Sequence, residues 1–246
     1  MLVLLPPSET KADGGAGPPL DLDALCCPEL NPVRERLVSA LAELAADVPA
    51  SLDVLGLTER QADEVARNAA VRTAPTMPAL ERYTGVLYDA LDLASFGRAE
   101  RRRAGARLAV ASALFGLVRA NDPIPAYRLS GGTTLPELGT LRSVWHSVLT
   151  KSMSTVDDLI LDLRSGPYAN LASIPHAIVM RVVSADSSGR RVAISHFNKA
   201  YKGRLASVLA KAPREPGSVR GVVRIAAAAG IQLDVTSPRT IDLVVT

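Results

Sequence analysis

Cationic side chains gather in the segment AISHFNKAYKGRLASVLAKA at 193–212, where Lys199, Lys202 and Arg204 follow an apolar stretch. The chain has only five lysines, and three of them lie in this segment. Ammonium and guanidinium groups bind phosphates and carboxylates, and amide groups at the start of a helix favour the same ligands. The segment therefore predicts an anion-binding site.

A second candidate lies in RANDPIPAYRLSGGTTLP at 119–136, which contains Arg119, Tyr127 and Arg128. Two prolines fix the backbone before the tyrosine–arginine pair, and two glycines permit unusual backbone angles after it. Such a segment orients an arginine, whose planar group suits phosphate or carboxylate. The alternative is a simple turn in which Arg128 pairs with a nearby carboxylate such as Asp122.

Several polar side chains could transfer protons to or from a ligand that these cations bind. Histidine is the usual proton carrier near neutral pH, and His196 falls between an expected strand end and the lysines. The other candidates for proton transfer are Ser8, Glu9, Tyr88 and Asn198. With Arg128 and Lys199 holding an anion, these groups would form an active site for a small phosphorylated or nucleotide-like substrate.

Two amphipathic segments, at 32–47 and 58–70, predict helices joined by a connection that contains glycine. The second opens with Thr58 and carries Gln61 three residues later, which is a capping-box arrangement. The pair is compatible with a helix-hairpin-helix element at about 32–70, whose amide groups would bind a DNA phosphate. The alternative is two ordinary helices that pack on a core.

Composition restricts the class of protein. With 246 residues and 48% hydrophobic residues, the chain can bury a substantial core. The formal charge of +3 and a pI near 9.0 are only mildly basic, so any anion binding depends on local clusters. The apolar run LVLL at 2–5 is too short for a signal peptide or a membrane span, and we expect a cytoplasmic protein with no membrane partner.

The two cysteines, Cys26 and Cys27, are neighbours in the sequence. A disulfide between adjacent cysteines closes a strained ring, so we expect two ordinary thiols in a reducing compartment. The three histidines are scattered, and no spacing of histidines and cysteines is typical of a metal site. The sequence predicts no metal and no cofactor, and it gives no indication of the oligomeric state.

The elements that position these residues alternate between strand and helix along the whole chain. We expect a buried strand at 2–5 and a surface loop outside the core at 11–32. Residues 107–118 are almost wholly apolar and predict a core strand or a short internal helix. The arginine run at 98–103 is typical of a solvated helix face.

Further helices are expected at 79–92, at 141–153, where Trp145 should pack in the core, and at 198–212. Strands are expected within 157–171, 176–185, 190–197 and, as a pair, 231–246. The fold class is therefore α/β, with a mixed central sheet surrounded by helices. No break in composition divides the chain, which predicts one domain over residues 1–246.

Several blocks of the sequence, in order, resemble the YaaA family of peroxide stress proteins. They are LLPPSETK, YTGVLYDAL, LFGLVRANDPIPAYRLSGGTTL, ILDLRSGPYANL and AISHFNKAYKGRLASVLAKA. The resemblance implies an α/β domain with a helix-hairpin-helix-like element, a positively charged cleft, and a role in limiting iron-driven oxidative damage with DNA as ligand. The residues that would line or border this cleft are Lys11, Arg119, Tyr127, Arg128, Lys199, Lys202 and Arg204.

The sequence departs from the family pattern at two places. The family commonly opens with serine-proline-alanine-lysine-threonine where this chain has PPSETK, so Lys11 is displaced and Ser8 and Glu9 lie in its neighbourhood. Ser130 stands where the family has a carboxylate. Two functions remain open: a protein that binds double-stranded DNA, or an enzyme that acts on a small anionic ligand in the same cleft.

Overall fold

A mixed sheet of eight strands lies at the centre of the protein, in a computed structural model that describes residues 1–185, 191–193 and 198–245. The strand order is β11-β12-β9-β8-β1-β3-β4, and β10 pairs with β9. The strands are β1 (Leu2–Leu5), β3 (Leu108–Ser112), β4 (Gly116–Arg119), β8 (Ile160–Asp162), β9 (Ile178–Ala185), β10 (Arg191–Ala193), β11 (Leu233–Ser237) and β12 (Thr240–Val245). Two small ribbons are separate from it: β2 (Met77–Pro78) with β5 (Pro123–Ile124), and β6 (Thr134–Leu135) with β7 (Gly139–Thr140).

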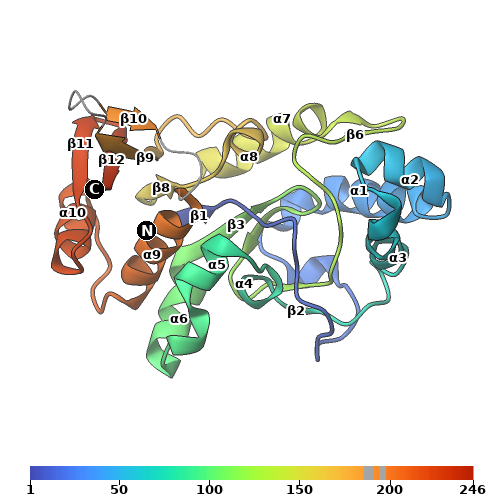
Figure 1. Cartoon of the computed structure of the whole chain (residues 1–246), viewed down its shortest axis with the longest axis horizontal. Helices are drawn as coiled ribbons and strands as arrows, with labels where there is room; N and C mark the ends of the chain where they lie inside the picture. The colour runs from blue at the N-terminus through green and yellow to red at the C-terminus, as the bar shows by residue number, and fades with distance from the viewer. Residues whose placement is uncertain (186–190, 194–197, 246) are drawn as a thin grey trace.

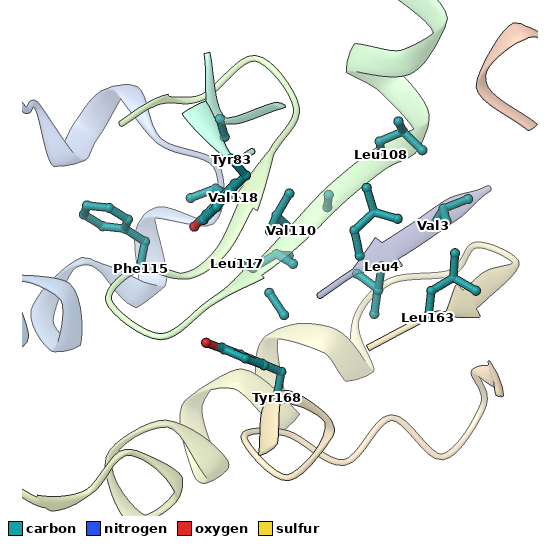
Figure 2. Close-up of a cluster of buried hydrophobic side chains, with 14 of the residues drawn as sticks. Val3, Leu4, Tyr83, Leu108, Val110, Phe115, Leu117, Val118, Leu163 and Tyr168 are labelled. Atoms are coloured by element: carbon teal, nitrogen blue, oxygen red, sulfur yellow. The ribbon is translucent and has the colours of Figure 1, made fainter. Parts of the chain in front are cut away.

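The inner strands of the sheet run parallel. Strand β1 pairs in parallel with β3 on one side and β8 on the other, and β9 and β12 continue the parallel run beyond β8. All four residues of β1 are buried, as expected for a strand covered on both faces. Figure 2 shows Val3 and Leu4 of β1 beside Leu108 of β3 and Leu163, which follows β8. The carboxyl ends of β1, β3 and β8 therefore meet at one edge of the sheet.

Helices surround this sheet (Figure 1). They are α1 (Asn31–Leu44), α2 (Val48–Leu55), α3 (Ala62–Ala69), α4 (Ala79–Arg82), α5 (Val86–Leu91), α6 (Arg98–Arg107), α7 (Leu141–Ser154), α8 (Gly166–Ala169), α9 (Asn198–Lys211) and α10 (Val219–Ala228). In Figure 1, α5, α6 and α9 gather on one side of β1 and β3, α7 and α8 lie on the other, and α1 to α3 form a group of their own.

Helices α5 and α9 cross at close range at Gly203. Any β-carbon at this position would collide with the carbonyl oxygen of Leu87 in α5, so only glycine allows the two backbones to approach so closely. This contact fixes α9 next to the loop that follows β1. Lys199, in the first turn of α9, is thereby held near the carboxyl edge of the sheet.

Many expected elements are confirmed. The α/β class, the buried strand at 2–5 and the helices at 141–153 and 198–212 are all present. Trp145 is fully buried and donates its indole N–H to the Ala113 carbonyl oxygen at 2.8 Å. The run at 98–103 falls in α6, where Arg98, Arg101 and Arg102 are exposed. Strand β10 ends at Ala193, and residues 194–197 of the expected strand lie outside the described residues.

Other expectations were wrong. Residues 107–118 form neither a single strand nor a helix but the β3–β4 hairpin, because Gly116 has a left-handed φ of 73° that reverses the chain. The segment 11–32 contributes to the core, since its own Leu25 and Leu30 are buried. The connection between the helices at 32–47 and 58–70 is mostly the additional helix α2, and Gly56 ends α2 in the left-handed conformation. Helix α10 had no counterpart among the expected elements.

Within the described ranges, no helix is both long enough and apolar enough to cross a lipid bilayer.

Candidate functional site

The loop after β1 lies at the carboxyl edge of the parallel strands. The neighbours of β1 in the sheet are β3 on one side and β8 on the other, and both follow β1 in the sequence. Ligands of open α/β sheets bind at such switch points. A pocket of about 270 Å³ opens here, lined by residues 6–10, residues 84–88 and Lys199. It is called the carboxyl-edge pocket below. It combines the loop after β1, the start of α5 and the first turn of α9.

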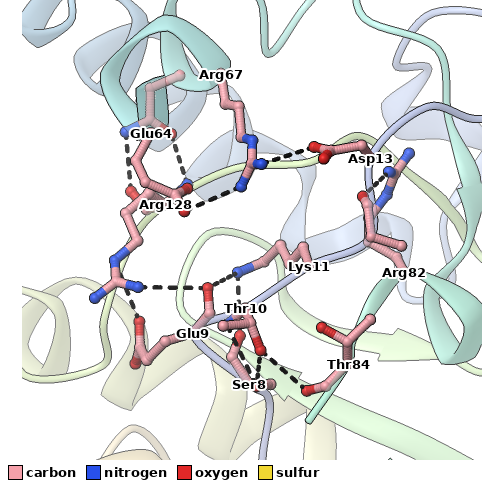
Figure 3. Close-up of polar contacts among 12 residues, drawn as sticks. Ser8, Glu9, Thr10, Lys11, Asp13, Glu64, Arg67, Arg82, Thr84 and Arg128 are labelled. Carbon is pink, nitrogen blue, oxygen red and sulfur yellow. Dashed lines mark hydrogen bonds and ion pairs between the residues drawn. The ribbon is translucent and has the colours of Figure 1, made fainter. Parts of the chain in front are cut away.

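Lys11 lies behind this pocket and is almost completely buried, with 7% of its surface exposed. Its Nζ donates hydrogen bonds to the carbonyl oxygens of Ser8 at 3.1 Å and Glu9 at 3.4 Å (Figure 3). The same atom lies 4.1 Å from the ring centroid of Tyr127 and 5.4 Å from that of Tyr83. Burial lowers the pKa of Lys11 to about 7, although the charge of Glu9 acts in the opposite direction. A large fraction of this amine is therefore neutral at physiological pH.

A chain of buried hydroxyl groups runs below Lys11 to the end of β3. The Tyr83 and Tyr127 hydroxyls are 2.8 Å apart, and the Tyr127 hydroxyl is 2.8 Å from Ser112 Oγ. The Phe115 N–H donates to Ser112 Oγ at 3.0 Å and anchors the chain to the hairpin. Burial raises the pKa of Tyr83 to about 12 and also raises the pKa of Tyr127 well above its usual value. Both phenols keep their protons and can donate hydrogen bonds. The row of hydroxyl groups from Tyr83 to Ser112 is therefore ordered beneath Lys11.

Glu9 is held from two sides. Its carboxylate lies 3.6 Å from Arg128 Nε and accepts a hydrogen bond from the Tyr168 hydroxyl at 3.3 Å. Glu9 Oε2 is buried and has no hydrogen-bond partner, which is unusual for a carboxylate oxygen. The Tyr168 hydroxyl in turn accepts the Gly131 N–H at 3.1 Å. Glu9 Oε2 is the oxygen that faces Arg128 Nε, so the carboxylate is held by an ion pair on this side.

The backbone of Arg128 is fixed by Asn68 of α3. Asn68 Oδ1 accepts the Arg128 N–H at 2.7 Å, and Asn68 Nδ2 donates to the Arg128 carbonyl oxygen at 2.9 Å. Next to this pair, Arg67 forms ion pairs with Glu64 at 3.0 Å and Asp13 at 2.7 Å (Figure 3). The cations on this side of the pocket are thus mostly neutralised by carboxylates of the chain itself.

A buried ion pair lies at the end of β8. Arg164 and Asp162 are paired at 2.8 Å, and both side chains are more than 90% buried. Lys202 of α9 donates to the carbonyl oxygen of Leu163 at 2.9 Å, and burial lowers the pKa of Lys202. The ammonium group of Lys202 is therefore used to hold α9 against β8.

The structure brings most of the predicted residues together around the carboxyl-edge pocket. Those that line it or contact its lining are Ser8, Glu9, Lys11, Tyr88, Arg128 and Lys199, and Tyr127 lies against Lys11. Tyr88 is buried and donates its hydroxyl to the Pro6 carbonyl oxygen at 2.9 Å, so it shapes the loop after β1. Asn198 is the half-buried first residue of α9. His196 lies outside the described residues.

Two predicted residues lie elsewhere. Arg119 is at the end of β4, which places it at the opposite, amino-terminal edge of the parallel strands, and its side chain donates to the Ala106 carbonyl oxygen at 2.9 Å. Arg204 is exposed on α9 and lines another pocket, of about 500 Å³, together with Tyr201 and Lys211. Neither side chain contributes to the lining of the carboxyl-edge pocket.

Sequence reasoning missed several residues of the site: Tyr83, Ser112, Tyr168, Asn68 and the Asp162–Arg164 pair. A signal was present for some of them, because Ser112 and Asp162 are polar residues within segments predicted to be buried, and each ends a strand in the structure. Polar residues at the carboxyl ends of parallel strands are typical of binding sites. The strand order, which the sequence does not reveal, was needed to read that signal.

Among the described residues, no group of three or more histidine, cysteine, aspartate or glutamate side chains is arranged to hold a metal ion.

Comparisons with known proteins agree with the resemblance in the sequence. The family model described as peroxide stress protein YaaA matches residues 1–225. A UPF0246 protein of Corynebacterium efficiens is 49% identical over the full length of both chains. Another, from Corynebacterium glutamicum, is 46% identical over 95% of each chain, and one from Streptomyces coelicolor is 42% identical over 97% of this chain and 94% of its own. The chain therefore belongs to the YaaA family of peroxide stress proteins.

Proposed function

We propose that this member of the peroxide stress family is a cytoplasmic enzyme that acts on a small phosphorylated or nucleotide-like molecule in the carboxyl-edge pocket. The observation that carries the proposal is Lys11, a buried amine whose pKa is lowered to about 7 beside that pocket. Active sites need acids and bases whose pKa lies near the working pH, and burial is the usual means of tuning a lysine. A lysine that only attracts phosphate gains nothing from losing its charge.

The pocket also supplies groups for the remaining roles. Lys199 is exposed and lines the pocket, and Arg128, with 17% of its side chain exposed, lies next to Glu9. These two cations would bind the anionic group of the substrate. Glu9, with one oxygen lacking a hydrogen-bond partner, and Lys11 would exchange a proton with the reacting part. A volume of about 270 Å³ suits a small molecule or the end of a larger one.

If Arg128 and Lys199 bind one anion, their effects on affinity are coupled. We expect Arg128→Ala and Lys199→Ala each to weaken binding of the ligand, and the double variant to deviate from additivity by about 0.5–3 kcal/mol. The ligand is first found by thermal shift with nucleotides and sugar phosphates, since a ligand at a hundred times its Kd stabilises the native state by about 2.7 kcal/mol. Isothermal titration then gives the four affinities of the cycle.

Arg142→Ala is the control for this cycle, because Arg142 is exposed on α7 and contributes nothing to the pocket lining. Its affinity is expected to equal that of the wild type. Strictly additive losses from Arg128 and Lys199 would assign them to separate sites. Failure of every small anion to shift the melting temperature would reject the enzyme proposal.

A second candidate function is the binding of double-stranded DNA through a positively charged cleft, as a means to limit iron-driven damage. One observation favours it: α2 and α3 are joined by a tight connection in which Gly56 has a φ of 62° and Gln61 Oε1 accepts the Thr58 N–H at 3.1 Å. Such a hairpin offers amide groups to a phosphate without reading the base sequence. The exposed Arg60 lies in the short helical turn that precedes α3.

Reversing charge in the hairpin tests this candidate. If the hairpin contacts DNA, the variant with Arg60→Glu and Arg67→Glu loses affinity for a duplex, and the slope of log affinity against log salt falls by about 0.9 for each lost phosphate contact. Fluorescence anisotropy with a labelled duplex at several salt concentrations measures both quantities. The matched control is Arg102→Glu on the exposed face of α6. Equal affinities for the wild type and the hairpin variant would remove the hairpin from any DNA site.

A further inference from the structure

The two neighbouring cysteines lie in an unusual stretch of backbone. Both are free thiols and both are half-buried. Cys27 has a φ of 58° and a ψ of 66°, a left-handed conformation that residues other than glycine adopt rarely. Such a conformation persists only where the surroundings impose it, and it is frequent at functional sites. Contacts with neighbouring residues therefore hold the Cys26–Cys27 pair in this conformation.

Cys26 is fixed on all sides by hydrogen bonds. Its N–H donates to Asp122 Oδ2 at 3.0 Å, and its Sγ lies 3.6 Å from the carbonyl oxygen of Leu117. Its own carbonyl oxygen accepts from Arg34 at 2.7 Å. Arg34 is fully buried and also donates to Phe115 and Leu117 of the β3–β4 hairpin, at 3.0 and 2.9 Å. The Cys26–Cys27 pair is thus held rigidly against the central sheet.

This environment makes the two thiols chemically different. The neighbouring Cys26 thiol, together with Ser152 and the charge of Arg34, lowers the pKa of Cys27, against the opposing effects of burial and Glu29. The hydrogen bond to Cys27, burial and the charge of Asp122 raise the pKa of Cys26. A thiolate is the form that reacts with oxidants. These contacts favour the thiolate at Cys27 over the thiolate at Cys26.

We propose that Cys26 and Cys27 form a peroxide-reactive dithiol that closes reversibly to a disulfide between neighbouring residues. The Cys27 thiolate attacks one oxygen of hydrogen peroxide, the O–O bond breaks, and hydroxide leaves as Cys27 becomes a sulfenic acid. The Cys26 sulfur then attacks the Cys27 sulfur, the S–O bond breaks, and the Cys26 proton leaves with the departing hydroxide as water. In total two thiols and one peroxide give one disulfide and two waters.

The strain of such a disulfide explains why it would be reversible. Adjacent α-carbons across a trans peptide are about 3.8 Å apart, whereas disulfides usually join α-carbons that are about 4.4–6.8 Å apart. A strained disulfide has a high reduction potential and is reduced readily by thiol exchange. In a reducing compartment the pair therefore rests as two thiols, and only an oxidant as strong as peroxide closes the ring. Closure of the disulfide would therefore respond to peroxide stress, the condition for which the family is described.

The test treats the full-length protein with hydrogen peroxide, blocks remaining thiols with iodoacetamide and measures the intact mass. We expect a species that has lost two hydrogen atoms, carries no alkylation, remains a single chain without reductant and regains both thiols with dithiothreitol. Two thiols that survive a tenfold excess of peroxide would overturn the proposal. Oxidation of Cys27 beyond sulfenic acid while Cys26 stays alkylatable, or a disulfide between chains, would also overturn it.

Single variants and the denatured chain assign the roles. Cys26→Ser is expected to gain one oxygen and to react with dimedone, because the sulfenic acid at Cys27 then has no resolving thiol. Cys27→Ser is expected to lose its thiol at least about tenfold more slowly, since Cys26 remains protonated. The wild type in urea keeps both thiols but loses the contacts with Arg34 and Ser152. Equal rates of peroxide consumption in native and urea-denatured protein would contradict an activated thiol, whether or not the variants fold.

Discussion

Replacing Lys11 by methionine is expected to stabilise the fold near neutral pH while abolishing ligand binding. Lys11 is buried, and its pKa falls from 10.5 in the unfolded chain to about 7 in the folded protein. A displacement of that size corresponds to about 5 kcal/mol of unfavourable free energy when the group must be charged in the fold. Methionine has a similar shape and carries no charge. Loss of the hydrogen bonds to Ser8 and Glu9 offsets part of the gain, which leaves about 2–3 kcal/mol.

The pH dependence of this gain has a defined sign. Between about pH 7 and pH 10.5 the unfolded chain binds a proton that the folded protein lacks, so the stability of the wild type rises with pH across this interval. Below about pH 7 both states hold the proton, and the full penalty remains. The advantage of Lys11→Met should therefore be greatest below pH 7 and decline towards pH 10.5.

Thermal melts of the two proteins between pH 6 and pH 10 measure this advantage, and a gain of 2–3 kcal/mol corresponds to a rise in Tm of about 5 °C or more. Lys151→Met is the matched control, because Lys151 is exposed on α7, and its Tm should follow that of the wild type at every pH. A Tm difference for Lys11→Met that stays constant across the range would mean that Lys11 titrates normally. A stabilised variant that still binds the ligand would assign the lysine a purely structural role.

Replacing Asp162 by asparagine is expected to destabilise the protein by about 3–5 kcal/mol, because it leaves a buried cation without its counterion. Arg164 is only 6% exposed at its side chain, and Asp162 accepts hydrogen bonds from Arg164 Nε and Nη2 at 2.8–3.1 Å. The same carboxylate favours the charged form of Lys202. Urea denaturation, analysed by linear extrapolation, measures the change in the free energy of unfolding.

Two further variants separate the charge effect from simple damage to the fold. Asp157→Asn changes an exposed carboxylate that precedes β8 and should leave stability within about 0.5 kcal/mol of the wild type. The double variant Asp162→Leu with Arg164→Met removes both charges and should recover much of the stability lost by Asp162→Asn. A double variant that is less stable than Asp162→Asn would mean that the hydrogen bonds of Arg164 to the Tyr168 and Ala172 carbonyl oxygens, at 3.2 Å each, outweigh the unpaired charge.

The sequence by itself determined the elements whose signal is local. Four consecutive apolar residues predicted β1, because a strand buried on both faces needs no polar alternation. The segments at 141–153 and 198–212 predicted α7 and α9, because a helix that packs on one face has apolar residues that recur with the helical period. The blocks shared with the YaaA family determined the family, which the match over residues 1–225 confirmed.

The tertiary structure decided which residues meet. Glu9 and the Tyr168 hydroxyl are 159 positions apart in sequence and in contact only because β1 and β8 are parallel neighbours whose carboxyl ends share one edge. No local pattern encodes that strand order. The same holds for the hydroxyl chain from Tyr83 to Ser112, which depends on the β3–β4 hairpin that was expected to be a single element.

The tertiary structure also decided the charge of Lys11. Lys11 was expected to be one of several cations that attract phosphate, since a lysine in a polar segment such as PPSETK gives no indication of burial. In the fold, Tyr83 and Tyr127 enclose its ammonium group, and the pKa falls to about 7. Charge is fixed by residue type only in water. In a folded protein the free energy of keeping a charge depends on neighbours that come from distant parts of the chain, so the tertiary structure sets it.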